Sequence, residues 1–325
     1  MNDINLYHTI FQKYLTENTF SQQPVELYEP VNYILSLGGK RLRPLLVLMG
    51  CELFDNDLEK ALGAAMAVEI FHNFTLLHDD IMDAAPLRRG QPTVHQKYGI
   101  NTGILSGDVM MIHAYRFLEQ GTDPKIMPRL LQIFNKMAIE VCEGQQFDMI
   151  FENRKDVTIE QYIRMIELKT SVLIAAAFQM GALIGGSTEG VAEHLYEFGR
   201  NVGVAFQIQD DILDTFGDPE KFGKKVGGDI VQNKKTFLVL KSHELGNPTQ
   251  LTDLQALMNS TTENETEKIK AVRHIFEAVG VRAAAEAEMN NYLKIAFQHI
   301  EETPLSIEKK IYLKSFANDL MMRQT

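Results

Sequence analysis

The sequence has few cysteines and no excess of positive charge. Its 325 residues include two cysteines, Cys51 and Cys142, at no metal-ligand spacing, so we expect two small core residues in a reducing compartment and no disulfide framework. Lysines and arginines number 32 against 43 aspartates and glutamates, a formal net charge of -11. A general affinity for nucleic acid is excluded, because binding to the phosphate backbone needs a basic surface.

The chain also lacks the segments that direct a protein across or into a membrane. Residues 1–14 are polar and mixed in charge, without the basic-then-apolar order of a secretion signal. The most apolar stretch, 171–186, contains Gln179 and is shorter than the roughly 20 residues of a membrane span. We therefore expect a cytoplasmic protein with no transmembrane segment, in which this stretch is a buried helix.

Strand-like alternation is scarce, whereas apolar residues recur at helical spacing almost throughout the chain. Helices are predicted at 28–37, 44–53, 58–83, 101–119, 128–151, 158–168, 171–184, 189–215 and from 267 to the end. The helix at 158 begins with a capping box. A turn is predicted at 85–92 and a glycine-rich functional loop at 217–233. No composition shift divides the chain, so we predict one all-α domain over 1–325.

Two acidic clusters share the pattern D-D-x-x-D, and each follows a long apolar run: the first pentad, Asp79–Asp83, and the second pentad, Asp210–Asp214. The first and fifth residues of each lie on one helix face, where like charges repel and also oppose the helix dipole. A cation must compensate, and carboxylate oxygens combined with substrate phosphate suit Mg²⁺. One pentad could be an acidic surface, but two favour the metal-lined mouth of a deep apolar cavity within a helical bundle.

Basic residues gather beside these acids although the chain is acidic overall. Gly39–Pro44 carries three cations, Arg88–Arg89 follows the first pentad, and further lysines lie at Lys169 and around the glycine-rich loop. An isolated basic turn is usually only solvated, and arginines beside aspartates could be simple neutralisation. Their concentration at both pentads favours a site for metal-neutralised phosphates.

A few polar residues interrupt the apolar runs ahead of the pentads. His72 lies two helical turns before Asp79 on nearly the same face, whereas His78 is interpreted as a hydrogen-bonded core residue. Gln207 lies on the face of the second pentad and is the better site candidate. Gln209 could be a satisfied buried amide.

The order of these motifs resembles that of the trans-isoprenyl diphosphate synthases, which include farnesyl and geranylgeranyl diphosphate synthases. The resemblance spans roughly residues 38–236 and rests on Gly38–Pro44, Leu77–Asp83, Arg88–Gly90, Gly107–Asp108, Gly144–Asp148, Lys169–Thr170, Phe206–Asp214 and Gly223–Lys224. It implies the isoprenoid synthase fold, a homodimer, and a reaction between an allylic diphosphate (dimethylallyl, geranyl or farnesyl) and isopentenyl diphosphate.

The same resemblance implies roles for individual residues. Three Mg²⁺ ions would be held by Asp79, Asp80, Asp83, Asp210, Asp211 and Asp214. The allylic diphosphate would contact Arg88, Lys169, Lys224 and Lys234, and isopentenyl diphosphate would contact Lys40, Arg43, His72 and Arg89. Catalytic roles would fall to Lys169, Thr170, Gln207 and Lys224, and Gln145 and Asp148 would support the metal site. Lys234 is preferred to Lys235 by its distance from Asp229.

Product length would depend on the helix ahead of Asp79. Phe74 lies about 7.5 Å lower along the helix axis and Phe71 about one turn deeper. The aromatic ring of Phe74 should limit growth while its neighbour Thr75 is small, so by resemblance we expect a C20 product, with C15 close behind. A longer-chain synthase, a noncatalytic synthase subunit and a terpene cyclase or head-to-head condensing enzyme are alternatives. Gly39–Pro44 disfavours a cyclase, because it implies a second diphosphate pocket.

Overall fold

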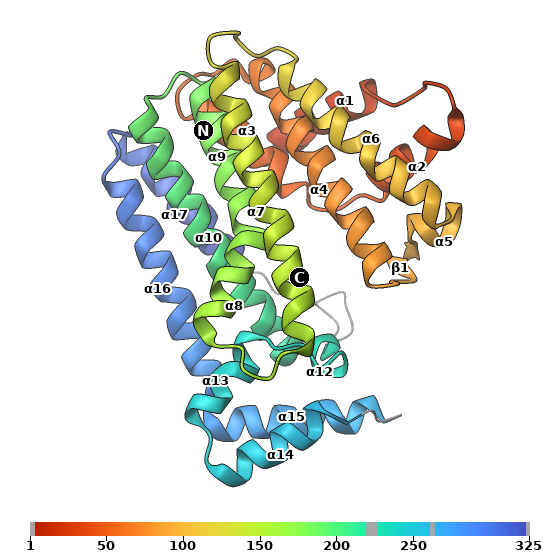
Figure 1. Cartoon of the computed structure of the whole chain (residues 1–325). Coiled ribbons are helices and arrows are strands. Elements are labelled where there is room, and N and C mark those ends of the chain that lie inside the picture. The colour runs from red at the N-terminus through yellow and green to blue at the C-terminus, as the bar shows by residue number, and fades with distance from the viewer. Residues whose placement is uncertain (1–3, 219–225, 261–263, 323–325) are drawn as a thin grey trace. The chain divides into compact units, whose positions relative to one another are not determined.

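The structure is a computed structural model that describes residues 4–218, 226–260 and 264–322, most of them helical (Figure 1). Two-residue strands, β1 (Leu87–Arg88) and β2 (Gln91–Pro92), pair as an antiparallel hairpin, the single sheet among the described residues. The all-α prediction is confirmed. Hairpin β1–β2 forms where the sequence predicted a turn.

By its contacts the chain divides into two compact units, Met1–Asn135 with Ala176–Tyr196, and Lys136–Ala175 with Glu197–Thr325. Helices α7 (Met127–Asn153), α9 (Val172–Ile184) and α10 (Glu189–Phe216) contribute to both units. This division by contacts does not test the single domain over 1–325, which stays a prediction.

The first unit is formed by the helices of the amino-terminal half. They are α1 (Ile4–Glu17), α2 (Val25–Ser36), α3 (Leu42–Glu52), the short 3₁₀ turn η1 (Leu58–Ala61), α4 (Leu62–Met82), α5 (Val94–Tyr98) and α6 (Ile100–Glu119). The sequence did not predict α1. It buries Tyr7, Phe11 and Leu15 on one face, a spacing hidden by the polar residues between them.

Glycine lets two backbones of the first unit come close together. A Cβ at Gly181 of α9 would lie 2.1 Å from the carbonyl oxygen of Val47 on α3, and one at Gly50 would lie 2.7 Å from that of Phe178. Larger residues would force α3 and α9 apart. By length and composition one described helical stretch, Ile159–Ile184, could cross a membrane, but 83% of its most apolar window is buried inside the protein, as predicted for a core helix.

The second unit is formed by later helices. They are α8 (Ile159–Ile166), the π-helical turn η2 (Glu167–Ser171), α12 (Gly228–Val231), α13 (Phe237–Leu245), α14 (Pro248–Met258), α15 (Glu265–Val279), α16 (Val281–Glu301) and α17 (Ile307–Met321). Thr158 and Gln161 form the predicted capping box of α8. The core of this unit includes Ile166, Val204, Leu238, Leu254 and Phe276. α12 lies within the stretch predicted as a loop, of which residues 219–225 lie outside the described residues.

Candidate active site

The first pentad ends α4, as predicted. Asp83 follows the last helical residue, and its N–H donates to the carbonyl oxygen of Asp79 at 2.9 Å. The Asp80 side chain is 3% exposed and receives two hydrogen bonds from Arg88, Nε to Oδ2 and Nη2 to Oδ1, each 2.7 Å. Both carboxylate oxygens of Asp80 therefore have a partner within the first unit.

The β1–β2 hairpin presents the two arginines that follow this pentad. Arg88 ends β1, and Arg89 occupies the tight turn with a φ of 53°. Arg89 Nη1 donates to the carbonyl oxygen of Gly38, and a Cβ at Gly39 would lie 2.6 Å from Arg89 Cζ. Gly39 is needed because no side chain fits beneath the guanidinium group.

Of the three basic residues in Gly39–Pro44, Arg41 has its side chain buried inside the protein. Arg41 is 6% exposed and pairs with Glu69, which is 2% exposed, and it also donates to the carbonyl oxygen of Leu35. Arg41 was not among the predicted diphosphate ligands of this cluster, and its charge is neutralised by Glu69. The sequence offered one signal for this pairing. Glu69 is an acid within an apolar helix, and a buried carboxylate needs a partner.

The other residues of this cluster form a positive group in the first unit. Arg43 Nη1 lies 3.1 Å from His72 Nε2. Burial, Arg43 and Arg89 hold the pKa of His72 well below its usual value, so the ring is neutral and Nε2 accepts a hydrogen bond from Arg43. Lys40 lies exposed just before α3. Several cations around a neutral histidine favour binding of an anion.

The second pentad lies near the carboxyl end of α10, which continues two residues beyond it. Asp211 is 3% exposed and accepts hydrogen bonds from Tyr162 Oη at 2.5 Å and from the Phe237 N–H at 3.0 Å. Burial raises the pKa of Asp211 to about 8, against the two hydrogen bonds that lower it. The second aspartate of each pentad is thus held within its own unit.

The described part of the predicted glycine-rich loop, from residue 226 on, is hydrogen-bonded to the second pentad. The Asp229 N–H donates to Asp214 Oδ2 at 3.1 Å, and the Gly227 N–H donates to the Asp214 carbonyl oxygen. Lys234 Nζ lies 4.0 Å from Asp229 Oδ1, whereas Lys235 is directed to carbonyl oxygens at the end of α7. These directions agree with the preference for Lys234. Lys224 lies outside the described residues.

Lys169 and Thr170 lie in the π-helical turn η2. A Cβ at Gly144 of α7 would lie 2.2 Å from the Lys169 backbone nitrogen, so glycine is needed at this crossing. Lys169 Nζ binds Asp148 Oδ2 at 2.6 Å, and Thr170 Oγ1 lies 3.4 Å from Gln207 Oε1. The structure thus brings Thr170 and Gln207 close together and pairs Lys169 with Asp148, which was predicted to support the metal site. The catalytic roles of these residues stay predictions.

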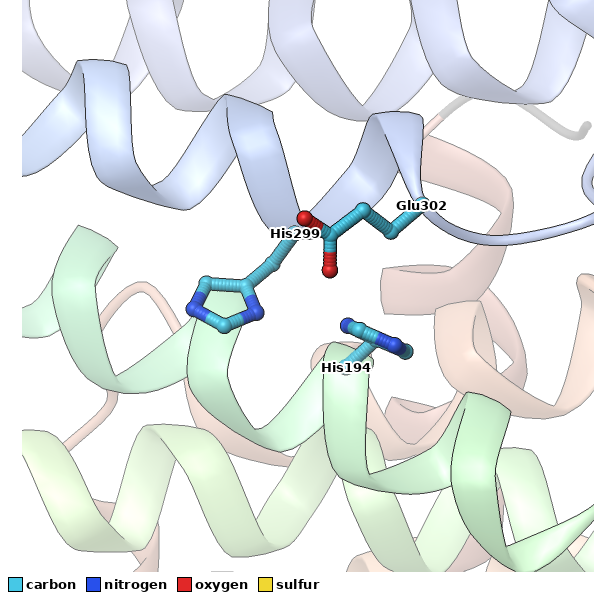
Figure 2. Close-up of side chains that lie close together, drawn as sticks. All are labelled: His194, His299 and Glu302. Atoms are coloured by element: carbon cyan, nitrogen blue, oxygen red, sulfur yellow. The ribbon is translucent and has the colours of Figure 1, made fainter.

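Each unit brings together its share of the predicted residues. Lys40, Arg43, His72, Arg88, Arg89 and the first pentad belong to the first unit, and Lys169, Thr170, Gln207, Lys234 and the second pentad belong to the second. The donors fit Mg²⁺, because carboxylates four residues apart on one helix face are hard ligands that need a cation. Sequence reasoning missed Tyr162 and the backbone N–H of Phe237. Figure 2 shows three further residues of types that can bind a metal, which belong to neither group. They are His194 on α10, His299 on α16 and Glu302, which directly follows α16.

The helical architecture is that of the isoprenoid synthase fold. The Polyprenyl synthetase family model matches residues 24–276, and the chain belongs to this family. It is 41% identical over 282 residues to a geranylgeranyl diphosphate synthase from Methanosarcina mazei, covering 86% of this chain and 82% of the relative. It is 36% identical over 298 residues to a geranylfarnesyl diphosphate synthase from Natronomonas pharaonis, covering 86% of each.

Solved structures agree with this assignment. A crystal structure of a geranylgeranyl pyrophosphate synthase matches with a TM-score of 0.95 and 48% sequence identity over 100% of both chains. The chain is therefore a prenyltransferase.

Replacing Tyr162 by Phe should lower the free energy of unfolding by about 1–3 kcal/mol, because buried Asp211 loses its phenolic hydrogen bond. Tyr115→Phe is the matched control, since Tyr115 Oη donates to Asn135 at an exposed position. It should change stability by less than about 0.5 kcal/mol. Denaturant unfolding of both variants provides the measurement, and equal losses would contradict the role given to Tyr162.

Proposed function

We propose that this prenyltransferase joins isopentenyl diphosphate to an allylic diphosphate and releases geranylgeranyl diphosphate as its main product. The observation that carries the proposal is the shared construction of the two pentads. In each, the second aspartate is held by protein donors, Arg88 for Asp80 and Tyr162 for Asp211. This contact sets the rotation of the helix that carries the first and fifth carboxylates.

We assign Mg²⁺ binding to Asp79, Asp83, Asp210 and Asp214, with Asp80 and Asp211 as the residues that orient them. These residues would hold the three ions. Bound Mg²⁺ would stabilise the negative charge that develops on diphosphate as the allylic C–O bond breaks. Because neighbouring carboxylates repel, affinity for the metal should exceed that of one isolated acid.

The basic residues have two tasks in this proposal. Arg88, Lys169, Lys224 and Lys234 would bind the allylic diphosphate and neutralise the leaving group. Lys40, Arg43, His72 and Arg89 would bind isopentenyl diphosphate. The neutral state of His72 suits this second group, because the ring can accept from Arg43 while its other nitrogen donates to phosphate.

Carbon–carbon bond formation needs no protein nucleophile. The alkene of isopentenyl diphosphate supplies the electron pair to the allylic cation, and loss of a proton to the departed diphosphate restores a double bond. Thr170 and Gln207, whose oxygens lie 3.4 Å apart, supply oxygen dipoles that would stabilise the cation. Apolar side chains would exclude water, which would otherwise trap the cation as an alcohol.

The direct test is incubation with labelled isopentenyl diphosphate, each allylic primer and Mg²⁺, followed by sizing of the products. Chelation of the metal should abolish turnover. Asp79→Asn should lower kcat about 100-fold or more, because one metal ligand loses its charge. Asp253→Asn, an exposed aspartate on α14, should leave kcat unchanged. An active enzyme under chelation, or equal effects of both substitutions, would contradict the proposal.

A row of aromatic rings in edge-to-face and tilted contact in the first unit supports a C20 product. Phe74 contacts the Phe71 ring at a centroid distance of 5.7 Å and the His78 ring at 4.8 Å, and Phe71 contacts Phe134 at 5.5 Å. Gly107 leaves space for His78, because a Cβ there would lie 2.2 Å from His78 Nε2. The ring of Phe74 is thus held on both sides. The geranylfarnesyl relative makes C25 the alternative product.

Phe74→Ala should lengthen the product by at least one isoprene unit, because truncation opens space beyond the growing chain. Phe297→Ala on α16 is the matched truncation and should leave product length unchanged. Chromatographic sizing of dephosphorylated products gives the measurement. Unchanged length in Phe74→Ala would remove this residue from chain-length control.

We also propose that the enzyme is a cytoplasmic homodimer. Helix α6 exposes an apolar stripe of Ile104, Leu105 and Ile112, with 42%, 59% and 67% of each residue accessible. Leu105→Glu and Ile112→Glu should yield monomers by light scattering, because a charge would be buried at the interface. Ile307→Glu replaces an exposed residue of α17 and should leave the dimer intact. A dimer in all three variants would contradict the assignment of α6.

A further inference from the structure

Adjacent lysines after the glycine-rich loop have different surroundings. Lys234 has a side chain that is 42% exposed and lies 4.0 Å from Asp229. Lys235 is half-buried, and its Nζ donates to the carbonyl oxygens of Phe151 at 2.7 Å and Glu152 at 2.8 Å. These oxygens belong to the last turn of α7, where carbonyls lack partners within the helix and favour a cation. Figure 1 shows α12 beside this end of α7.

The segment that carries both lysines is fixed to the second pentad at each end. The Asp229 N–H donates to Asp214 Oδ2, and the Phe237 N–H donates to Asp211 Oδ2 at 3.0 Å. Between these points the side-chain ammonium of Lys235 is bound to another helix. A displacement of this ammonium would move Lys234 on one side and the Phe237 N–H on the other.

A second buried lysine holds the same segment. Lys268 of α15 is 4% exposed and donates to Asn233 Oδ1 at 2.6 Å and to the Ser260 carbonyl oxygen at 3.0 Å. Asn233 adopts a φ of 57°, a left-handed conformation in which asparagine is enriched among residues with a Cβ. The chain turns sharply immediately before Lys234. Lys268 holds this turn through the side chain of Asn233, and Lys235 holds it through the end of α7.

We propose that Lys235 is a positioning residue for the prenyl transfer reaction. By binding the last carbonyls of α7, it fixes segment 233–237 so that Lys234 faces the allylic diphosphate and the Phe237 N–H keeps Asp211 oriented. This inference rests on the proposed function. The proposal gives the two lysines different roles, because Lys234 binds substrate whereas Lys235 acts only through its neighbours.

Amide hydrogen exchange tests the structural half without any turnover. In Lys235→Met the Phe237 amide should exchange about tenfold faster than in the original protein, because the charged hydrogen bonds that hold its segment are lost. Lys235→Arg keeps the charge and donors and should restore most of the protection. Lys241→Met removes an exposed lysine of α13 that pairs with Glu244 and should not change this amide. Unchanged exchange in Lys235→Met would overturn the proposal.

Steady-state kinetics tests the functional half. Lys235→Met should lower kcat about tenfold and leave the KM for isopentenyl diphosphate unchanged, with recovery in Lys235→Arg. A double variant, Lys234→Met with Lys235→Met, should lose less activity than the product of the two single losses, because part of the effect of Lys235 passes through Lys234. Losses that multiply in the double variant would overturn the proposal, as would a lower unfolding temperature with unchanged kcat. An inactive original protein would instead refute the proposed function, while the exchange result would still stand.

Discussion

Carboxylates four residues apart at the end of a helix repel each other, and the residues around both pentads must compensate for this repulsion. Both α4 and α10 place such a pair where the helix dipole adds to the repulsion. A folded protein can keep these pairs if a divalent cation binds them. Arg88 holds Asp80 in place, and Tyr162 with the Phe237 N–H holds Asp211.

The second aspartate of each pentad shows how this orientation is achieved. Arg88 grips Asp80 with two hydrogen bonds, and Tyr162 with the Phe237 N–H grips Asp211. One arrangement uses an arginine from a hairpin eight residues away, the other a phenol from a different helix. The two units thus use different donors to orient the second aspartate of each pentad.

Most of the fold followed from the sequence, because apolar spacing and the capping box at Thr158 are local signals. The pentads were also visible, since acids at fixed spacing after apolar runs are rare in a plain surface. The resemblance named Lys40 and Arg43 and left Arg41 out, but the sequence alone could not show why, because the partner of Arg41 is Glu69, 28 residues away. Tyr162 was missed for the same reason, as its partner lies 49 residues along the chain. The π-helical turn at Lys169 depends on the close approach of Gly144, which no local pattern encodes.

The central claim is that the first and fifth carboxylates of each pentad bind divalent metal ions. Anomalous scattering from crystals grown with Mn²⁺ and inorganic pyrophosphate tests it most directly. Manganese should be bound by Asp79 and Asp83 and by Asp210 and Asp214. Manganese absent from either pentad, or bound only by Asp80 or Asp211, would contradict it.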